Sequence, residues 1–135
     1  MAEPRRIAEI AGFHAHVYFT PQQGRAARAL REAVAARFAV RLGTWHERAV
    51  GPHSRAMFQI AFAPALFGSL VPWLMLNHGA LSILVHANSG NPRKDHVADG
   101  IWIGEALPLD EAVLPEHEDE PEGVPAPNTV PHLEP

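Results

Sequence analysis

The chain has 135 residues, of which 47% are hydrophobic and 19% are charged, and this is material for one ordinary domain. The composition excludes a wholly disordered chain, a coiled coil and a multidomain enzyme, and the lack of cysteine excludes disulfides, thiolate metal sites and cysteine nucleophiles. The formal net charge is −4, but the acids are concentrated near the C-terminal end, so the rest of the chain is close to neutral and lacks the basic face of a nucleic-acid binder.

The first predicted element is a strand over residues 13–19, where apolar residues alternate strictly with two histidines and a tyrosine. A helix is predicted to follow this strand. Thr20 suits the N-cap and Pro21 suits the first turn of such a helix. Apolar residues then recur at helical spacing as far as Phe38.

The later elements are shorter. We expect strands over residues 40–46, 54–62, 81–86 and 101–103, and a second helix over residues 64–77. Pro72 is expected to bend or break that helix, because it removes one backbone donor. The order βαββαβ, with a short strand added, predicts an α+β fold of the ferredoxin-like plait type with strand order 4-1-3-2. Both helices would then cover one face of the antiparallel sheet and leave the other face open.

Residues 115–135 contain six prolines and six acids but almost no large apolar side chain. Such a segment cannot bury enough surface to offset the entropy of ordering it, so we expect a domain over 1–114 and a disordered, acidic tail over 115–135. No apolar run reaches the ~18 residues of a membrane helix, and residues 1–6 lack the apolar stretch of a signal peptide. We therefore expect a cytoplasmic protein that has neither a membrane nor a nucleic acid as partner.

Four of the nine histidines are predicted to share the open face of the sheet. Side chains of a strand alternate between its two faces, so the histidines of the first strand point away from the predicted helices. The corresponding positions of the third and fourth strands carry two more histidines. The four are His14, His16, His53 and His86, and Tyr18 and Arg55 share their face.

Two histidines at i and i+2 on a strand, such as His14 and His16, lie close enough to share a metal. In the expected strand order His86 lies beside His14 and completes a three-histidine site with open positions. His53 lies at the opposite end, unless a hairpin or a second subunit brings it in. The alternative is that these are ordinary structural histidines. Arg55 could hold a substrate carboxylate with two hydrogen bonds, or it could be a solvated surface arginine.

Six short segments, in this order and spacing, resemble the DOPA 4,5-dioxygenase family. They are FHAHVYF (13–19), VGPH (50–53), PWLMLN (72–77), LVH (84–86), DH (95–96) and WIG (102–104). The resemblance implies an extradiol ring-cleaving dioxygenase that acts on L-DOPA or a related catechol with O₂. It also implies a non-haem Fe(II) cofactor, with another divalent metal as an option in the purified protein.

Carried over by position, the recurrent histidines of the family match His14, His16, His53, His86 and His96, and the resemblance does not assign which of them bind the metal. The strand topology favours His14, His16 and His86 as the ligands. In the implied chemistry His53 or His96 would suit the proton-transfer role, with Tyr18 as a donor. Usual non-haem iron sites also include a carboxylate, for which Asp95 or Glu47 is the candidate in this sequence. A site of three histidines is the alternative. Asp95 and His96 could instead orient a ligand or cap a turn.

Two other functions stay open at this point. One is a non-catalytic dimeric module that binds a small ligand, and the other is a cofactor-free mono-oxygenase in which a histidine acts only as a base. A stoichiometric metal would favour the dioxygenase, whereas oxygen chemistry that survives chelation would favour the mono-oxygenase. We expect a homodimer, because an uncovered sheet face invites pairing.

Overall fold

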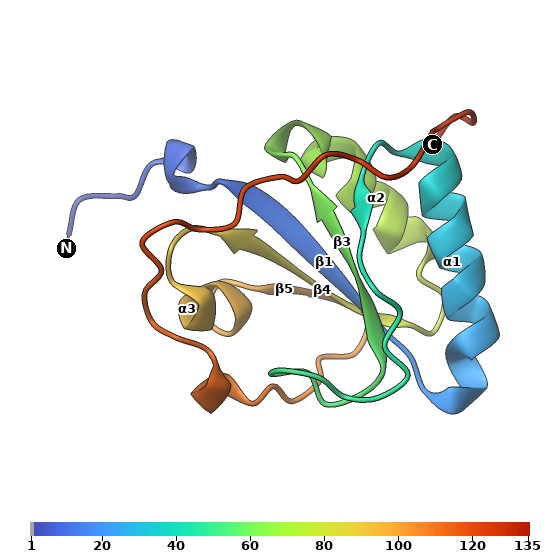
Figure 1. Ribbon diagram of the computed structural model, residues 1–135, viewed down its shortest axis with the longest axis horizontal. Helices are drawn as coiled ribbons and strands as arrows, with labels where there is room; N and C mark the ends of the chain where they lie inside the picture. The colour runs from blue at the N-terminus through green and yellow to red at the C-terminus, as the bar shows by residue number, and fades with distance from the viewer. Residues whose placement is uncertain (1) are drawn as a thin grey trace.

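A computed structural model describes residues 2–135, which form an α+β fold built on one antiparallel sheet. The strands are β1 (Gly12–Tyr18), β2 (Arg41–Leu42), β3 (Met57–Phe62), β4 (Ser82–Asn88) and β5 (Ile101–Ile103). The helices are α1 (Gly24–Arg37), α2 (Phe67–Asn77) and the short α3 (Pro92–His96). The strands lie side by side in the order β2-β3-β1-β4-β5 (Figure 1). This order contains the predicted run 4-1-3-2, with the added strand next to β4.

Both longer helices pack against one face of the sheet. The side chains of Ala15 and Val17 on β1 are fully buried on this face, and they share a core with Leu30 of α1 and Leu70 of α2. The predicted capping box is present, since the Thr20 N–H donates to Oε1 of the Gln23 side chain at 3.0 Å, but it opens a 3-10 turn over Pro21–Gln23, and α1 begins after it at Gly24. Helix α2 is not broken at Pro72 but continues through it, and a bend at this proline stays a prediction.

The second and third strands are shorter than the sequence predicts. The predicted strand over 40–46 is reduced to Arg41–Leu42, and the predicted strand over 54–62 begins only at Met57. Residues 43–56 instead form a loop, in which Gly51 turns the chain with a φ of 55°. This loop returns His53 to the sheet, where it forms an isolated bridge with Leu109.

The second face of the sheet is covered, in contrast to the open face that the sequence predicts. Tyr18, Met57 and Leu84 on this face pack with Leu107, which follows β5, and are all buried. Helix α3 lies over the end of β4 on this side (Figure 1). The argument for a homodimer from an uncovered face is thereby removed, and the homodimer stays a prediction. No helix within residues 2–135 is long and apolar enough to cross a membrane.

We call residues 115–135 the C-terminal segment. It contains no helix or strand, but it makes specific contacts where the sequence predicts a disordered tail. The backbone N–H of Asn128 donates to the carbonyl of Val40 at 3.0 Å, and the N–H of His132 donates to the carbonyl of Ala36 at 2.7 Å. The physical reason is that backbone hydrogen bonds to α1 and to the residues before β2 compensate for the small apolar burial of the segment. The prolines also restrict the unfolded chain, so less entropy is lost when the segment docks.

Candidate metal and catalytic site

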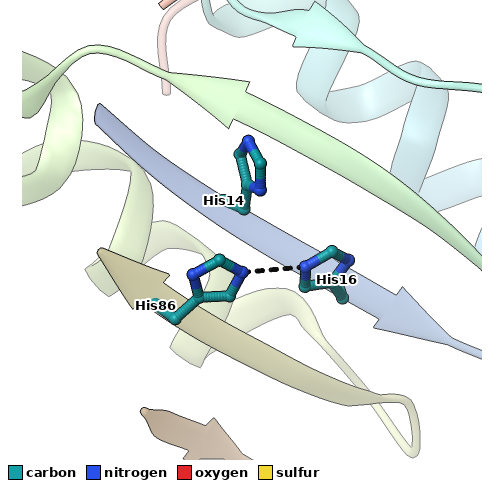
Figure 2. Close-up of side chains that lie close together, drawn as sticks. All are labelled: His14, His16 and His86. Atoms are coloured by element: carbon teal, nitrogen blue, oxygen red, sulfur yellow. Dashed lines mark hydrogen bonds between the residues drawn. The ribbon is translucent and has the colours of Figure 1, made fainter. Parts of the chain in front are cut away.

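Three histidines from the two central strands form the centre of the site. His14 and His86 face each other directly in the β1–β4 register, and His16 lies two residues further along β1 on the same face. All three are buried, and one ring nitrogen from each lies within 4.8 Å of those of the other two (Figure 2). The structure thus brings together the three residues that the sequence singles out as metal ligands, because strand alternation and register determine their positions.

The tautomer of His86 follows from its partners. Its Nδ1 lies 2.9 Å from the carbonyl oxygen of Ala87, and since a carbonyl only accepts, Nδ1 carries the proton and donates. The neutral ring therefore has its free lone pair on Nε2. This Nε2 lies 2.9 Å from Nε2 of His16, whose N–H donates to it when no ion lies between them (Figure 2).

The spacing of these nitrogens fits a metal ion. Two ligands at 90° with metal–nitrogen bonds of about 2.1 Å lie about 3.0 Å apart. The Nε2 atoms of His16 and His86 are separated by 2.9 Å, so both could bind one ion with little movement. In addition, Nδ1 of His16 and Nε2 of His14 are buried without a hydrogen-bond partner among the described residues. Buried ring nitrogens usually have a partner, so the second nitrogens of two candidate ligands still lack the groups that would orient their rings.

His53 and Tyr18 form the second part of the site. The Tyr18 hydroxyl lies 2.7 Å from Nδ1 of His53, and both side chains are buried. The His53 ring centroid lies 4.3 Å from that of His16. The sequence places His53 at the far end unless a hairpin or a second subunit brings it in. The predicted third strand starts too early, and the loop of residues 43–56 turns back and brings His53 to the cluster within one chain.

His96 joins the same group from α3, a helix that is absent from the elements predicted above. Its ring centroid lies 3.8 Å from that of His86, and its Nδ1 lies 2.7 Å from the carbonyl of Pro92. The signal for this helix is present in the sequence. Asn91 accepts a hydrogen bond from the Lys94 N–H as an N-cap, and Pro92 occupies the first helical position. We call His14, His16, His53, His86 and His96 the histidine cluster.

The two carboxylates considered from the sequence are occupied elsewhere. Asp95 accepts hydrogen bonds from the backbone N–H and the hydroxyl of Ser89, at 2.8 and 2.6 Å, and so fixes the turn between β4 and α3. Glu47 accepts from the indole N–H of Trp45 at 2.7 Å. Asp95 also lines the cavity at the cluster, together with two carboxylates of the C-terminal segment, Glu118 and Glu122. Oε2 of Glu122 lies 3.4 Å from Nε2 of His14.

Burial determines the protonation of the histidine cluster. Loss of water lowers the pKa of every ring, to well below its ordinary value for His16 and His86 and to about 4 for His53. Neighbouring rings lower the pKa of His16 and His86 further, because cations at these distances would repel one another. The cluster is therefore neutral at pH 7, which is the form that binds metals and accepts protons.

A cavity of about 250 Å³ opens onto the cluster. This volume lies below the range of drug-sized pockets and suits a molecule built on a single ring. Its lining includes His14, His16, His53, His96, Gln59, Pro52, Glu118 and Glu122. Arg55 is not part of this lining, and its role in binding substrate stays a prediction.

A larger cavity, of about 390 Å³, lies between the N-terminal residues and the adjoining ends of β1 and β4. Its lining is mainly apolar and includes Phe13, Phe67 and Ile101. Of the histidine cluster it reaches only His86. Two of the three candidate ligands, His14 and His16, line the smaller cavity together with His53 and His96, so we place the site there.

Comparisons with known proteins find relatives that match most of this chain. A 38% identical relative, described as an "Uncharacterized 21.2 kDa protein" of Botryotinia fuckeliana, matches over 120 residues, which are 80% of this chain and 66% of the relative. The "DOPA 4,5-dioxygenase" of Amanita muscaria is 35% identical over 84% of this chain and 54% of its own length. The chain thus spans about half to two thirds of the length of these curated relatives.

A solved structure with the same fold comes from Nostoc punctiforme and is described as "a putative dioxygenase". It is 45% identical, superposes with a TM-score of 0.80, and the match covers 82% of this chain and 96% of that one. The model of the Dopa 4,5-dioxygenase family matches residues 13–113, which include the whole histidine cluster. On this evidence the chain belongs to the Dopa 4,5-dioxygenase family.

Proposed function

We propose that this protein is a non-haem iron dioxygenase that opens the ring of L-DOPA or a related catechol in extradiol fashion. The observation that carries the proposal is the buried group His14, His16 and His86, whose ligand atoms lie within 4.8 Å of one another beside a cavity of single-ring size. Membership of a dioxygenase family supports oxygen chemistry at this group.

In this proposal, His14, His16 and His86 hold the iron. Bound iron would supply one centre at which both catechol oxygens and O₂ meet, and it would lower the pKa of the catechol hydroxyls. The strands keep the three rings in place, so little side-chain freedom is lost when the centre forms.

His96 is suited to take a proton from the catechol. Its Nδ1 donates to the Pro92 carbonyl at 2.7 Å, which leaves the lone pair on Nε2, and the ring lines the cavity. Burial lowers its pKa, so the ring is neutral and able to accept.

His53 and Tyr18 are suited to hold a proton at the opposite side of the cluster. Burial raises the pKa of the Tyr18 hydroxyl, so the hydroxyl stays protonated and donates to Nδ1 of His53 across 2.7 Å. This fixes the orientation of the His53 ring against His16 and leaves the proton on its Nε2, from which the ring could donate it within the cavity.

We also infer that the fold is a ferredoxin-like plait extended by β5, because the strand order and the one-sided position of α1 and α2 are those of that fold. Its assembly as a homodimer and its cytoplasmic location stay predictions.

The test loads the protein with Fe(II) without oxygen, adds L-DOPA or simple catechols with O₂, and follows oxygen uptake and visible absorbance. We expect iron-dependent oxygen uptake with a new yellow chromophore, lost in His86→Ala and kept in His132→Ala, a control histidine remote from the cluster. Bound iron without uptake on any catechol would refute ring cleavage. Oxygen uptake that persists after the iron is removed with a chelator would favour a cofactor-free mono-oxygenase. A protein that binds no metal and consumes no oxygen would favour a binding module.

A further inference from the structure

The C-terminal segment passes over the histidine cavity and is held on both sides of it. On one side, the Glu118 N–H donates to the carbonyl of Gly90 at 2.9 Å, close to α3. On the other side, the Asn128 side chain binds both the N–H and the carbonyl of Leu42, at 2.7 and 2.9 Å. Between these anchors the chain runs past the start of β1 towards α1 (Figure 1). Residues 119–127 therefore bridge the side of the sheet on which the cavity opens.

Glu122 lies in the middle of this bridge and reaches the histidine cluster. Its Oε2 is 3.4 Å from Nε2 of His14, while its side chain is 57% exposed. Nε2 of His14 is buried and has no hydrogen bond at this separation. A small rotation of the partly exposed Glu122 side chain would bring the two atoms to hydrogen-bond distance.

The two ring nitrogens of His14 face in different directions. In Figure 2 one nitrogen lies on the side of His16 and the other is turned away from both partner rings. Since Nε2 is the atom that Glu122 approaches, Nδ1 is the atom left for the cluster. The carboxylate and the proposed metal position thus lie on opposite sides of one imidazole ring.

The start of β1 fits closely against the same stretch of chain. A Cβ on Gly12 would lie 3.0 Å from Cγ2 of Val124, which is tighter than ordinary van der Waals contact. Because Gly12 has no side chain, Val124 of the C-terminal segment can pack directly against β1, two residues before His14. The approach of Glu122 to His14 is part of this close packing and does not rest on the glutamate side chain alone.

We propose that Glu122 is a positioning residue for His14: its carboxylate accepts the Nε2–H, fixes the tautomer with a free Nδ1, and so orients a ligand of the metal centre. The same bond holds the C-terminal segment across the cavity. This inference rests on the proposed metal centre. Metal-bound histidines commonly donate their second ring N–H to a carboxylate, which raises the basicity of the ligand atom.

No other carboxylate that the sequence suggested is free for this role, because Asp95 and Glu47 are engaged by Ser89 and Trp45. Glu122 also lies beyond the residues matched by the family model, which end at 113. The segment that carries it therefore adds to the site a group that the matched domain does not contain.

The experiment compares the full-length protein with Glu122→Ala and with Glu120→Ala, an exposed glutamate of the same segment that serves as control. Both variants remove one negative charge from the same stretch of chain. Affinity for Co(II), an air-stable probe for the iron position, is measured by competition with a coloured chelator. The tautomer of His14 is read from its ring ¹⁵N shifts in the metal-free protein, with the signals assigned by their loss in His14→Gln.

We expect Glu122→Ala to weaken Co(II) binding by about 10-fold or more and to move His14 away from the Nε2–H tautomer. Glu120→Ala should leave both readouts unchanged. Unchanged affinity and an unchanged tautomer in Glu122→Ala would overturn the inference while leaving the metal centre in place. If the parent protein binds no Co(II), the metal centre fails, and the tautomer in the metal-free protein still decides whether Glu122 orients His14.

Discussion

Tyr18→Phe tests the hydrogen bond that orients His53. The substitution removes one oxygen and leaves the ring in its apolar surroundings, which include Met57 and Leu84. The hydroxyl that is lost lies 2.7 Å from Nδ1 of His53. Tyr18 is fully buried and His53 is 8% exposed, so water cannot readily replace the missing partner.

The magnitude follows from these two contributions. A typical hydrogen bond contributes about 1 kcal/mol to stability, and a buried acceptor left without a partner costs about 1–3 kcal/mol. We therefore expect Tyr18→Phe to lower the free energy of unfolding by about 2 kcal/mol. At about 2 cal/mol/K of unfolding entropy per residue, this corresponds to a Tm lower by roughly 7 °C for a chain of this length.

Urea denaturation of the metal-free protein measures the change, and a double-mutant cycle assigns it to the pair. In a His53→Ala background, Tyr18→Phe should cost less than in the parent by about 1 kcal/mol or more, because the partner is already absent. An equal cost in both backgrounds would show that the hydroxyl acts through something other than His53 and would refute the reasoning.

Three further predictions concern the metal, the pH dependence and the C-terminal segment. We expect the variants His16→Ala and His86→Ala to lose bound metal while their far-UV circular dichroism stays unchanged. The variant His53→Ala should retain metal and turn over more slowly. If metal analysis finds metal retained in the first two variants, the ligand assignment is wrong. The metal-free protein should lose stability as the pH falls from 6.5 towards 4, because the His53 pKa is lowered from 6.5 to about 4 and the unfolded chain then binds the proton more readily. For this group alone the loss between pH 7 and pH 5 is about 2 kcal/mol, and urea midpoints that do not move between these values would refute it. Asn128→Ala should lower the free energy of unfolding by about 1–2 kcal/mol, because it removes both hydrogen bonds to Leu42. A urea denaturation curve identical to that of the parent protein would show that the C-terminal segment is not anchored at Leu42.

The centre of the site could be predicted from the sequence because it is built on strands. The period-two alternation of side chains places His14 and His16 on one face. The antiparallel register then sets His86 opposite His14. The strand order follows from the succession of helices and strands, so a group of three histidines from two strands needs no information beyond pattern and topology.

The remaining groups come from loops, which have no comparable periodicity. His53 reaches the cluster because the chain turns at Gly51, and His96 reaches it on a five-residue helix. The approach of Glu122 depends on where a proline-rich segment docks more than a hundred residues after His14. The sequence around Glu122 has no periodicity, so it does not predict that this carboxylate lies next to His14.

The bond between Asn128 and Leu42 also bears on how copies of this protein meet one another. An edge strand presents free N–H and carbonyl groups that can pair with another chain and start aggregation. The amide of Asn128 occupies both backbone groups of Leu42, so β2 offers less of such a template. The opposite edge, β5, is only three residues long, although Ile101 is 48% exposed. A chain cut before Asn128 would uncover the β2 edge, and its solutions should form aggregates at lower concentration than those of the intact protein.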